Sequence, residues 1–317
     1  MTKTVQVVLS GGLGNQMFMY AAGRALAART NARLVLEISS FQRDYAYRRM
    51  YLLDRFPIRA DVRSQNAWSS VLLTAEKLVR KFPRIAARCG LIDEPRVGGL
   101  EAFESRLLSP PALPFFSLRG YWQSEAYFQD VADLLRDELT PPPPTDEVAC
   151  AELFRIRESA HPVAVCIRFF SEVVDGGLPV QETLAIFQKQ LSVHSSGIPG
   201  CKYFVFTDSP AHLMDSRCLG VPFTLITHRT RNEDALTDLA LITACRTFFL
   251  GYSSFHWWGA WLATAPDKRV TYLKFPGRPG KGYAAQGWIV EDVRLGHEPV
   301  TDCKYRRGVS GHTRKSQ

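Results

Sequence analysis

The chain has 317 residues, of which 46% are hydrophobic and 22% charged, and its formal net charge is +8. This composition predicts a globular protein with a buried core, and the positive charge favours an anionic partner such as nucleic acid, a phosphorylated donor or an anionic membrane surface. No run reaches the roughly 18 apolar residues of a membrane-spanning helix, and the start lacks the apolar stretch of a signal peptide, so we expect a cytosolic protein. The seven cysteines form no C-x-x-C pair, which argues against a disulfide framework and a zinc site.

The N-terminal part predicts a parallel βαβ unit. Residues 5–9 and 34–38 have the pattern of strands, and a helix is expected over 16–29 after a glycine turn at 10–14. Residues 67–90 predict a basic helix that Pro83 bends or ends. Four consecutive prolines at 141–144 favour an extended spacer, and we place a domain boundary there.

Strands and helices alternate again beyond the prolines. Strands are expected at 163–169, 203–207, 223–227, 247–252 and 270–274, with helices at 235–246 and 255–263. Regular alternation predicts a doubly wound parallel sheet, so the fold class is α/β, with two Rossmann-like domains facing a cleft. The expected division is residues 1–144, residues 145–300 and a basic tail at 301–317.

The first candidate site is the loop GGLGNQ at residues 11–16. Its glycines allow a tight turn and a close approach of the backbone to a phosphate or sugar. Met17 stands where the dinucleotide fingerprint has its last glycine, although Glu37 lies near the place of a ribose-binding acid. A nicotinamide-dependent oxidoreductase therefore remains an alternative, as does a purely structural turn.

Other candidate residues follow the C-terminal strands. Arg168 closes an apolar strand and can grip a pyrophosphate or form a structural ion pair. Asp238 lies on an apolar helix, where its carboxylate can accept two donors from a guanine base or bond the backbone. Ser253 and Ser254 start a helix whose free N–H groups suit a phosphate. The tryptophans in SSFHWWGAWL at 253–262 build core more often than a sugar platform.

Four segments resemble the α-1,2-fucosyltransferase family, glycosyltransferase family eleven, in its bacterial branch. They are GGLGNQMFMY at 11–20, RGYWQSEAYF at 119–128, YFVFTD at 203–208 and SSFHWWGAWL at 253–262, in the order of that family. The resemblance covers residues 5–275. It implies an inverting transferase with a GT-B-like pair of α/β domains that uses GDP-fucose as donor.

The resemblance also implies roles for individual residues. Arg168 matches the arginine that holds the β-phosphate, and Asp238 matches the acid that pairs with guanine. The remaining expected donor-binding residues are Gly12, Gly14, Asn15, Gln16, Asp208, Ser253 and Ser254. The family's His-x-Arg-Arg-Gly-Asp reads CIRFFS at 166–171, so its histidine, second arginine and acid are absent here.

The remaining expectations concern catalysis and partners. Glu172 is the nearest carboxylate after Arg168 and is the candidate base, with late proton transfer through water as the alternative. The chain has no Asp-x-Asp, so we expect no metal ion and no other cofactor. The resemblance implies transfer to a galactoside hydroxyl in an α-1,2 linkage, with an α-1,3 or α-1,6 linkage as the alternative. The expected acceptor is an oligosaccharide of a surface glycan or lipopolysaccharide, free or lipid-linked, and the basic tail suggests peripheral contact with the inner membrane. A nucleic-acid-binding module would not explain Asp238 or the serine pair, so neither nucleic acid nor a partner protein is expected.

Overall fold

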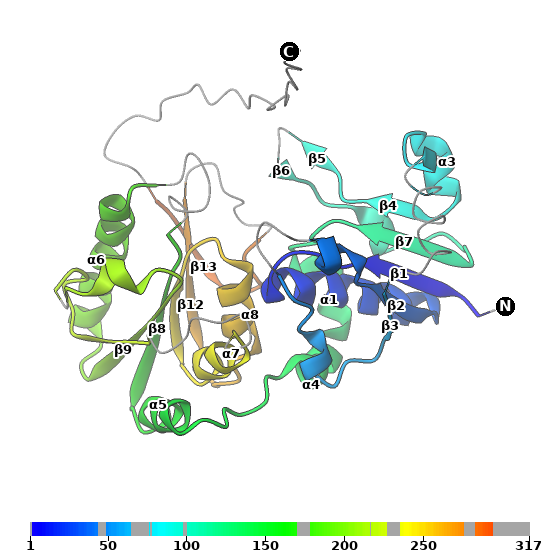
Figure 1. The fold of residues 1–317 in the computed structure, drawn as a ribbon. Coiled ribbons are helices and arrows are strands. Elements are labelled where there is room, and N and C mark those ends of the chain that lie inside the picture. Colours follow the sequence, from blue (N-terminus) through cyan, green and yellow to red (C-terminus); the bar gives the residue numbers. More distant parts are fainter. Residues whose placement is uncertain are drawn as a thin grey trace, which may run out of the picture.

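The computed structural model describes residues 2–43, 49–64, 76, 78–97, 100–169, 178–215, 217–226, 235–275 and 283–293. In this part of the chain two parallel sheets lie side by side, each with helices packed on it (Figure 1). The predicted α/β fold with two units is therefore confirmed. The tail at 301–317 lies outside the described residues.

The N-terminal sheet has five parallel strands in the order β3-β2-β1-β7-β4. Its strands are β1 (Thr4–Val8), β2 (Arg33–Glu37), β3 (Asp61–Arg63), β4 (Leu91–Asp93) and β7 (Phe115–Arg119). β1 alternates half-buried and buried residues, and its β-branched Val5 and Val7 are fully buried. A short antiparallel pair, β5 (Arg96–Val97) and β6 (Leu100–Glu101), stands apart from this sheet.

The C-terminal sheet has six parallel strands in the order β10-β9-β8-β11-β12-β13. Its strands are β8 (His161–Ile167), β9 (Cys201–Thr207), β10 (Phe223–Leu225), β11 (Thr247–Leu250), β12 (Arg269–Lys274) and β13 (Ile289–Asp292). Because β9, β8 and β11 are neighbours, the residues that follow them lie together at the carboxyl edge of this sheet.

Helices and short 3₁₀ turns connect the strands. The helices are α1 (Leu13–Thr30), α3 (Pro83–Arg88), α4 (Ala132–Leu139), α5 (Glu147–Arg157), α6 (Val180–Gly197), α7 (Ala235–Thr243) and α8 (Ser254–Leu262). The 3₁₀ turns are η1 (Ser39–Arg43), η2 (Leu53–Arg55), η3 (Ser105–Leu107), η4 (Glu125–Tyr127), η5 (Gln129–Val131) and η7 (Pro210–Leu213). Among the described helices none is long and apolar enough to cross a membrane.

Most predicted boundaries differ from the observed ones by one or two residues, and three differ by more. α1 begins at Leu13, within the expected turn, and α3 begins at Pro83, because proline at the first helical position needs no N–H. α7 ends at Thr243, before the expected residue 246. There the N–H groups of Ala244 and Cys245 bond three residues back, to Leu241 and Ile242, and the chain turns into β11.

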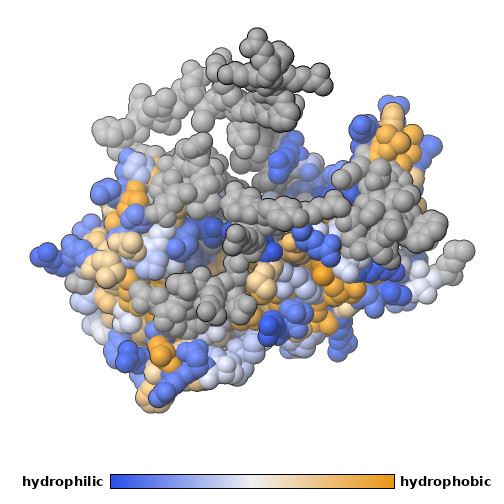
Figure 2. All heavy atoms as spheres, in the orientation of Figure 1, coloured by the Kyte–Doolittle hydropathy of each residue, from blue (hydrophilic) through white to orange (hydrophobic). Residues whose placement is uncertain are grey.

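The two sheets share one aromatic core, which lies where α1 packs against α8 (Figure 1). The ring of Phe18 is 4.6 Å from that of Trp257 and 5.1 Å from that of Trp258, and Phe128 stacks on Trp258 at 5.5 Å. Trp257, Trp258 and Trp261 are almost completely buried, so their predicted core role is confirmed. Hydrophobic and hydrophilic residues alternate over the face drawn in Figure 2, with hydrophobic surface over α3.

Candidate active site

The glycine loop after β1 leads directly into α1. Gly12 is the N-cap residue of α1, and no side chain caps the first turn. The guanidinium of Arg49 lies over this turn, because a Cβ built on Gly12 would be 3.7 Å from Arg49 Nη1. Uncapped amides beside a cation suit an anionic ligand. Arg49 is a candidate that the sequence patterns miss, since it lies outside every motif.

Gln16 is fully buried one turn into α1. Its Nε2 donates to the main-chain oxygens of Gly11, at 3.0 Å, and Met50, at 2.8 Å. Its Oε1 accepts a hydrogen bond from the N–H of Leu52 at 3.0 Å. The amide is thus bonded within the protein and has no exposed surface, and it fixes residues 50–52 against the glycine loop.

Asn15 belongs to a bridge between the two units. Nε2 of Gln123 donates to Asn15 Oδ1 at 2.8 Å, and the hydroxyl of Tyr252 donates to Gln123 Oε1 at 3.0 Å. Tyr252 follows β11 of the C-terminal sheet. Gln123 is a second residue that the predictions miss, and it places polar groups of both units within one hydrogen-bonded chain.

The backbone around Gln123 is held in an uncommon conformation. Gly120 has φ +153°, and Trp122 has φ +56°, which is rare for a bulky residue. The carboxylate of Glu94 accepts hydrogen bonds from the N–H groups of Tyr121 and Trp122 at 2.7 and 2.9 Å. Backbone strain that is stabilised in this way occurs most often at functional sites. The strained turn therefore supports a functional role for Gln123.

Gly14 lies against the first turn of α8. A Cβ on Gly14 would be 2.3 Å from the nitrogen of Phe255 and 2.4 Å from the carbonyl carbon of Ser254. The indole Nε1 of Trp258 donates to the oxygen of Gly14 at 3.1 Å. Only glycine permits this approach, so one role of Gly14 is to bring the amino ends of α1 and α8 together.

Arg168 and Asp208 follow neighbouring strands of the C-terminal sheet. Nε of Arg168 is 3.5 Å from Oδ2 of Asp208, and Oδ1 of Asp208 accepts from the N–H of Phe169 at 3.2 Å. The two side chains are 30% and 31% exposed. The ion pair considered as an alternative for Arg168 is thus present. The ion pair orients the Arg168 guanidinium, which solvent still reaches. Asp208, an expected donor-binding residue, contacts Arg168 in this pair.

Ser253 and Ser254 stand at the start of α8, as expected. Ser253 is the N-cap residue and is 5% exposed, and its Oγ accepts from the N–H of His256 at 3.4 Å. Ser254 is the first helical residue and is half-buried. The amino end of α8 therefore lies at the carboxyl edge of the sheet beside Arg168, where a helix favours negative charge.

Two buried polar groups near Arg168 have no hydrogen-bond partner among the described residues. They are Nδ1 of His256 and the hydroxyl of Tyr283, whose side chains are 6% and 1% exposed. Burial, and then the charge of Arg168, lower the pKa of His256 to about 3, so its imidazole is neutral at pH 7. Burial raises the pKa of Tyr283, against a smaller opposing effect of Arg168. Since buried polar groups are nearly always hydrogen-bonded, this pair indicates a place for a polar ligand.

Asp238 lies in the first turn of α7 and is half-buried. Its charge contributes to raising the pKa of Cys166, after burial and Cys245, which places Asp238 within electrostatic range of the end of β8. The predicted base Glu172 lies outside the described residues. Within the described ranges no group of three or more His, Cys, Asp or Glu side chains could hold a metal ion.

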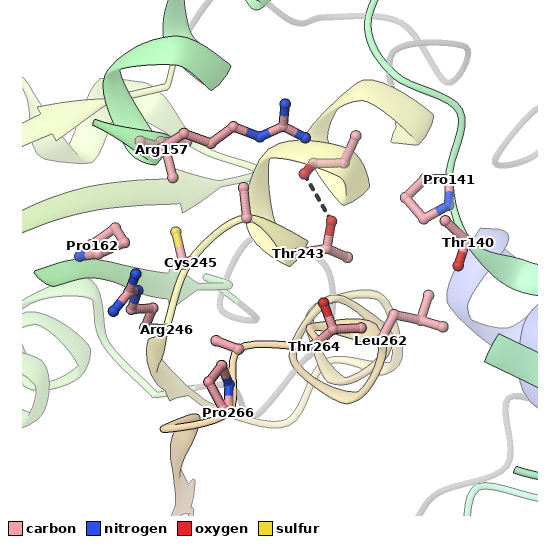
Figure 3. Close-up of a pocket in the computed structure, with 14 residues that line it drawn as sticks. Thr140, Pro141, Arg157, Pro162, Thr243, Cys245, Arg246, Leu262, Thr264 and Pro266 are labelled. Carbon is pink, nitrogen blue, oxygen red and sulfur yellow. Dashed lines mark hydrogen bonds between the residues drawn. The ribbon is translucent and has the colours of Figure 1, made fainter. Parts of the chain in front are cut away.

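A cavity of about 380 Å³ lies at the opposite edge of the C-terminal sheet. Pro162 near the start of β8 and Arg246 just before β11 line it, together with the carboxyl ends of α5, α7 and α8 (Figure 3). Helix carboxyl ends carry partial negative charge, which disfavours a diphosphate. Arg168, Asp208 and the serine pair lie at the carboxyl edge of this sheet, so we place the candidate site at that edge.

Comparison with known proteins gives relatives of low identity over most of the chain, and no family model matches. An Alpha-1,2-colitosyltransferase of Escherichia coli is 25% identical over 264 residues, or 80% of this chain and 86% of that protein. The O-antigen biosynthesis glycosyltransferase WbnK of Escherichia coli is 24% identical over 309 residues, or 89% of this chain and 98% of that protein.

The fold is also found among solved structures. A mutant of Arabidopsis thaliana FUT1 in complex with GDP has a TM-score of 0.52 and 12% identity, covering 86% of this chain and 70% of that chain. This likeness confirms the expected GT-B-like arrangement of two α/β units. The two bacterial relatives support glycosyl transfer as the activity, and the oxidoreductase alternative is not favoured.

Proposed function

We propose that this chain is an inverting fucosyltransferase of glycosyltransferase family eleven, which moves L-fucose from GDP-fucose to a galactoside hydroxyl in an α-1,2 linkage. The observation that carries the proposal is the meeting of Arg168, the amino end of α8 and the glycine loop where the two units join. The motif resemblance and the two glycosyltransferase relatives support the same reaction.

The proposed reaction is a single displacement at the anomeric carbon. Negative charge develops on the departing GDP, and groups that stabilise it in the transition state lower the barrier. Arg168 is held by Asp208 and supplies a permanent positive charge to the diphosphate. The amides at the start of α8 and the hydroxyl of Ser254 supply hydrogen bonds.

His256 and Tyr283 extend this leaving-group site. A neutral imidazole and a protonated phenol can each donate one hydrogen bond without bringing a further charge into a buried place. We propose that Nδ1–H of His256 and the Tyr283 hydroxyl donate to diphosphate oxygens beside Arg168. Their missing partners would then be supplied by the donor substrate.

The other parts of the donor have candidate partners too. Asp238 is proposed to accept from N1 and the exocyclic amine of guanine. Asn15, Gln123 and Tyr252 form a polar chain that spans both units and can read sugar hydroxyls. Arg168 takes the charge-neutralising role that a metal ion has in other transferases, so we propose a metal-independent reaction.

The acceptor hydroxyl loses its proton as the new bond forms. Glu172 is the proposed base, and proton transfer to water late in the reaction is the alternative. Glu172→Gln is expected to lower kcat by about 10²-fold or more while GDP affinity stays the same. Near-normal turnover in this variant would mean that water, and not Glu172, accepts the proton.

A second donor is favoured by the name of one relative. Colitose is L-fucose without its 3-hydroxyl, and a 25% identical relative is an Alpha-1,2-colitosyltransferase. The same leaving group and the same linkage would suit both sugars. The name of the other relative favours O-antigen as the glycan to which the sugar is added.

The test is GDP release in the presence of EDTA, with GDP-fucose or GDP-colitose as donor and with or without lactose. A fucosylated trisaccharide, formed with lactose-dependent GDP release from GDP-fucose, is the expected result. Transfer from GDP-colitose alone would select the second donor. Absence of turnover with both donors, together with no binding of GDP, would contradict the proposed function.

A further inference from the structure

A surface that is both apolar and basic surrounds α3. Leu78, Phe82 and Ile85 are 59%, 55% and 52% exposed, although each is large and hydrophobic. Exposed basic side chains lie between and beside them. The α3 surface is defined here as Leu78, Lys81, Phe82, Arg84, Ile85 and Arg88. Figure 2 shows hydrophobic residues beside hydrophilic ones at this protruding end of the N-terminal unit.

The opposite side of the same segment is fixed to the N-terminal sheet. The Arg80 side chain is 7% exposed, and its Nη2 donates to Oγ and O of Ser117 at 2.9 and 3.1 Å. Ala86 is 6% exposed. Because Arg80 and Ala86 face the sheet, Phe82 and Ile85 cannot turn inward without breaking these contacts. Their exposure is therefore a property of the fold.

All charged side chains of the α3 surface are positive. Residues 78–90 contain no aspartate or glutamate, and the nearby acids Glu76 and Asp93 are paired with Arg80. Large apolar side chains among exposed cations are typical of elements that lie in the headgroup region of a bilayer. There the apolar groups enter the acyl boundary and the cations meet anionic headgroups.

We propose that the α3 surface docks this protein on a bilayer that contains anionic phospholipids. Docking would hold the enzyme where a lipid-linked acceptor is presented, and in this respect the proposal rests on the proposed function. Membrane binding itself does not depend on the donor or on turnover. The two proposals therefore fail independently.

The test is co-sedimentation of the full-length protein with vesicles of phosphatidylglycerol and phosphatidylcholine, and with vesicles of phosphatidylcholine alone. We expect binding to the anionic vesicles, reduced roughly tenfold or more by Arg84→Glu or by Phe82→Ser with Ile85→Ser. Phe154 and Val193 are 65% and 70% exposed, so Phe154→Ser and Val193→Ser are matched controls that should bind like wild type.

Two outcomes of the sedimentation would overturn the proposal. One is no binding of the wild-type protein to anionic vesicles. The other is equal binding by the wild type and the α3 variants, which would assign the contact to another part of the chain, such as the basic tail. The rate of fucose transfer to lactose by the α3 variants should equal that of wild type, which separates this test from that of the proposed function.

A second measurement tests whether the membrane contact lies at the α3 surface. Cys89, directly after α3, and Cys150, on α5, are both exposed thiols. An environment-sensitive fluorophore is attached to one of them in variants whose other accessible cysteines are serine. The fluorophore at Cys89 should shift to the blue on anionic vesicles, while that at Cys150 should not. A shift at Cys150 alone would contradict docking through α3.

Discussion

Trp258 donates a hydrogen bond from its indole Nε1 to the main-chain oxygen of Gly14, over 3.1 Å. The bond joins α8 of the C-terminal unit to the first turn of α1 in the N-terminal unit. The amino ends of both helices lie at the carboxyl edges of their sheets. The two parts of the candidate site are therefore fixed relative to each other by helix packing.

Replacing Gly14 should weaken this contact. In Gly14→Ala the new methyl group would lie 2.3 Å from the nitrogen of Phe255, so α1 and α8 must move apart, at a cost of about 1–3 kcal/mol in the free energy of unfolding. Gly197→Ala is the control, because a Cβ there meets no atom within 4 Å. Urea unfolding compares the variants, and equal stability of the two would contradict the close approach.

The bridge through Gln123 predicts coupled effects on the donor. Gln123→Ala and Tyr252→Phe should each weaken GDP-fucose binding, and the double variant should lose less than the sum of the two, because both changes remove the same bond. Exposed Gln42 is the control position, with Gln42→Ala expected to bind like wild type. Calorimetric titration measures the affinities, and strictly additive losses would disprove the bridge.

His256 predicts a specific dependence of stability on pH. Its pKa is lowered to about 3 in the folded protein, so below pH 6.5 the unfolded chain takes up a proton that the folded protein does not. Stability is therefore lost as the pH falls from 6.5 towards 3. Between pH 7 and pH 5 this loss is about 2 kcal/mol, and His256→Asn should remove it.

The measurement for His256 is the free energy of unfolding in urea at pH 7 and pH 5. The difference between the two pH values should be smaller in His256→Asn than in wild type. Exposed His161 is the control, and His161→Asn should keep the wild-type difference. An unchanged difference in His256→Asn would mean that the imidazole is not buried in its neutral form.

Local patterns predict the part of the site that lies at strand ends. Arg168 directly follows β8, and the serine pair follows β11 after two residues. Parallel strands bring their carboxyl ends to one edge, so these residues could be placed from the sequence. Gln16 could not, because its partners Met50 and Leu52 are distant in the chain and follow no motif. These hydrogen bonds fix residues 50–52 against the glycine loop.

His256 and Gln123 show two other limits of pattern reading. His256 lies in an apolar, tryptophan-rich segment, and the spacing and composition of that segment indicate a buried core helix. The one sign of a polar site is the position of His256 in the first helical turn, after a capping serine. Gln123 obtains its role from contacts with residues of both units and from the strained turn at Trp122. The segment RGYWQSEAYF at 119–128 contains Gln123, but no local spacing within it indicates these long-range contacts.

Titration of GDP into the wild-type protein and into Arg168→Ala tests the central claim most directly. Loss of charge-assisted hydrogen bonds to the diphosphate should weaken binding by roughly 10- to 100-fold. Arg246→Ala alters the cavity at the opposite edge of the same sheet and should bind GDP like wild type. Normal affinity in Arg168→Ala, or loss of affinity in Arg246→Ala, would contradict the placement of the donor site.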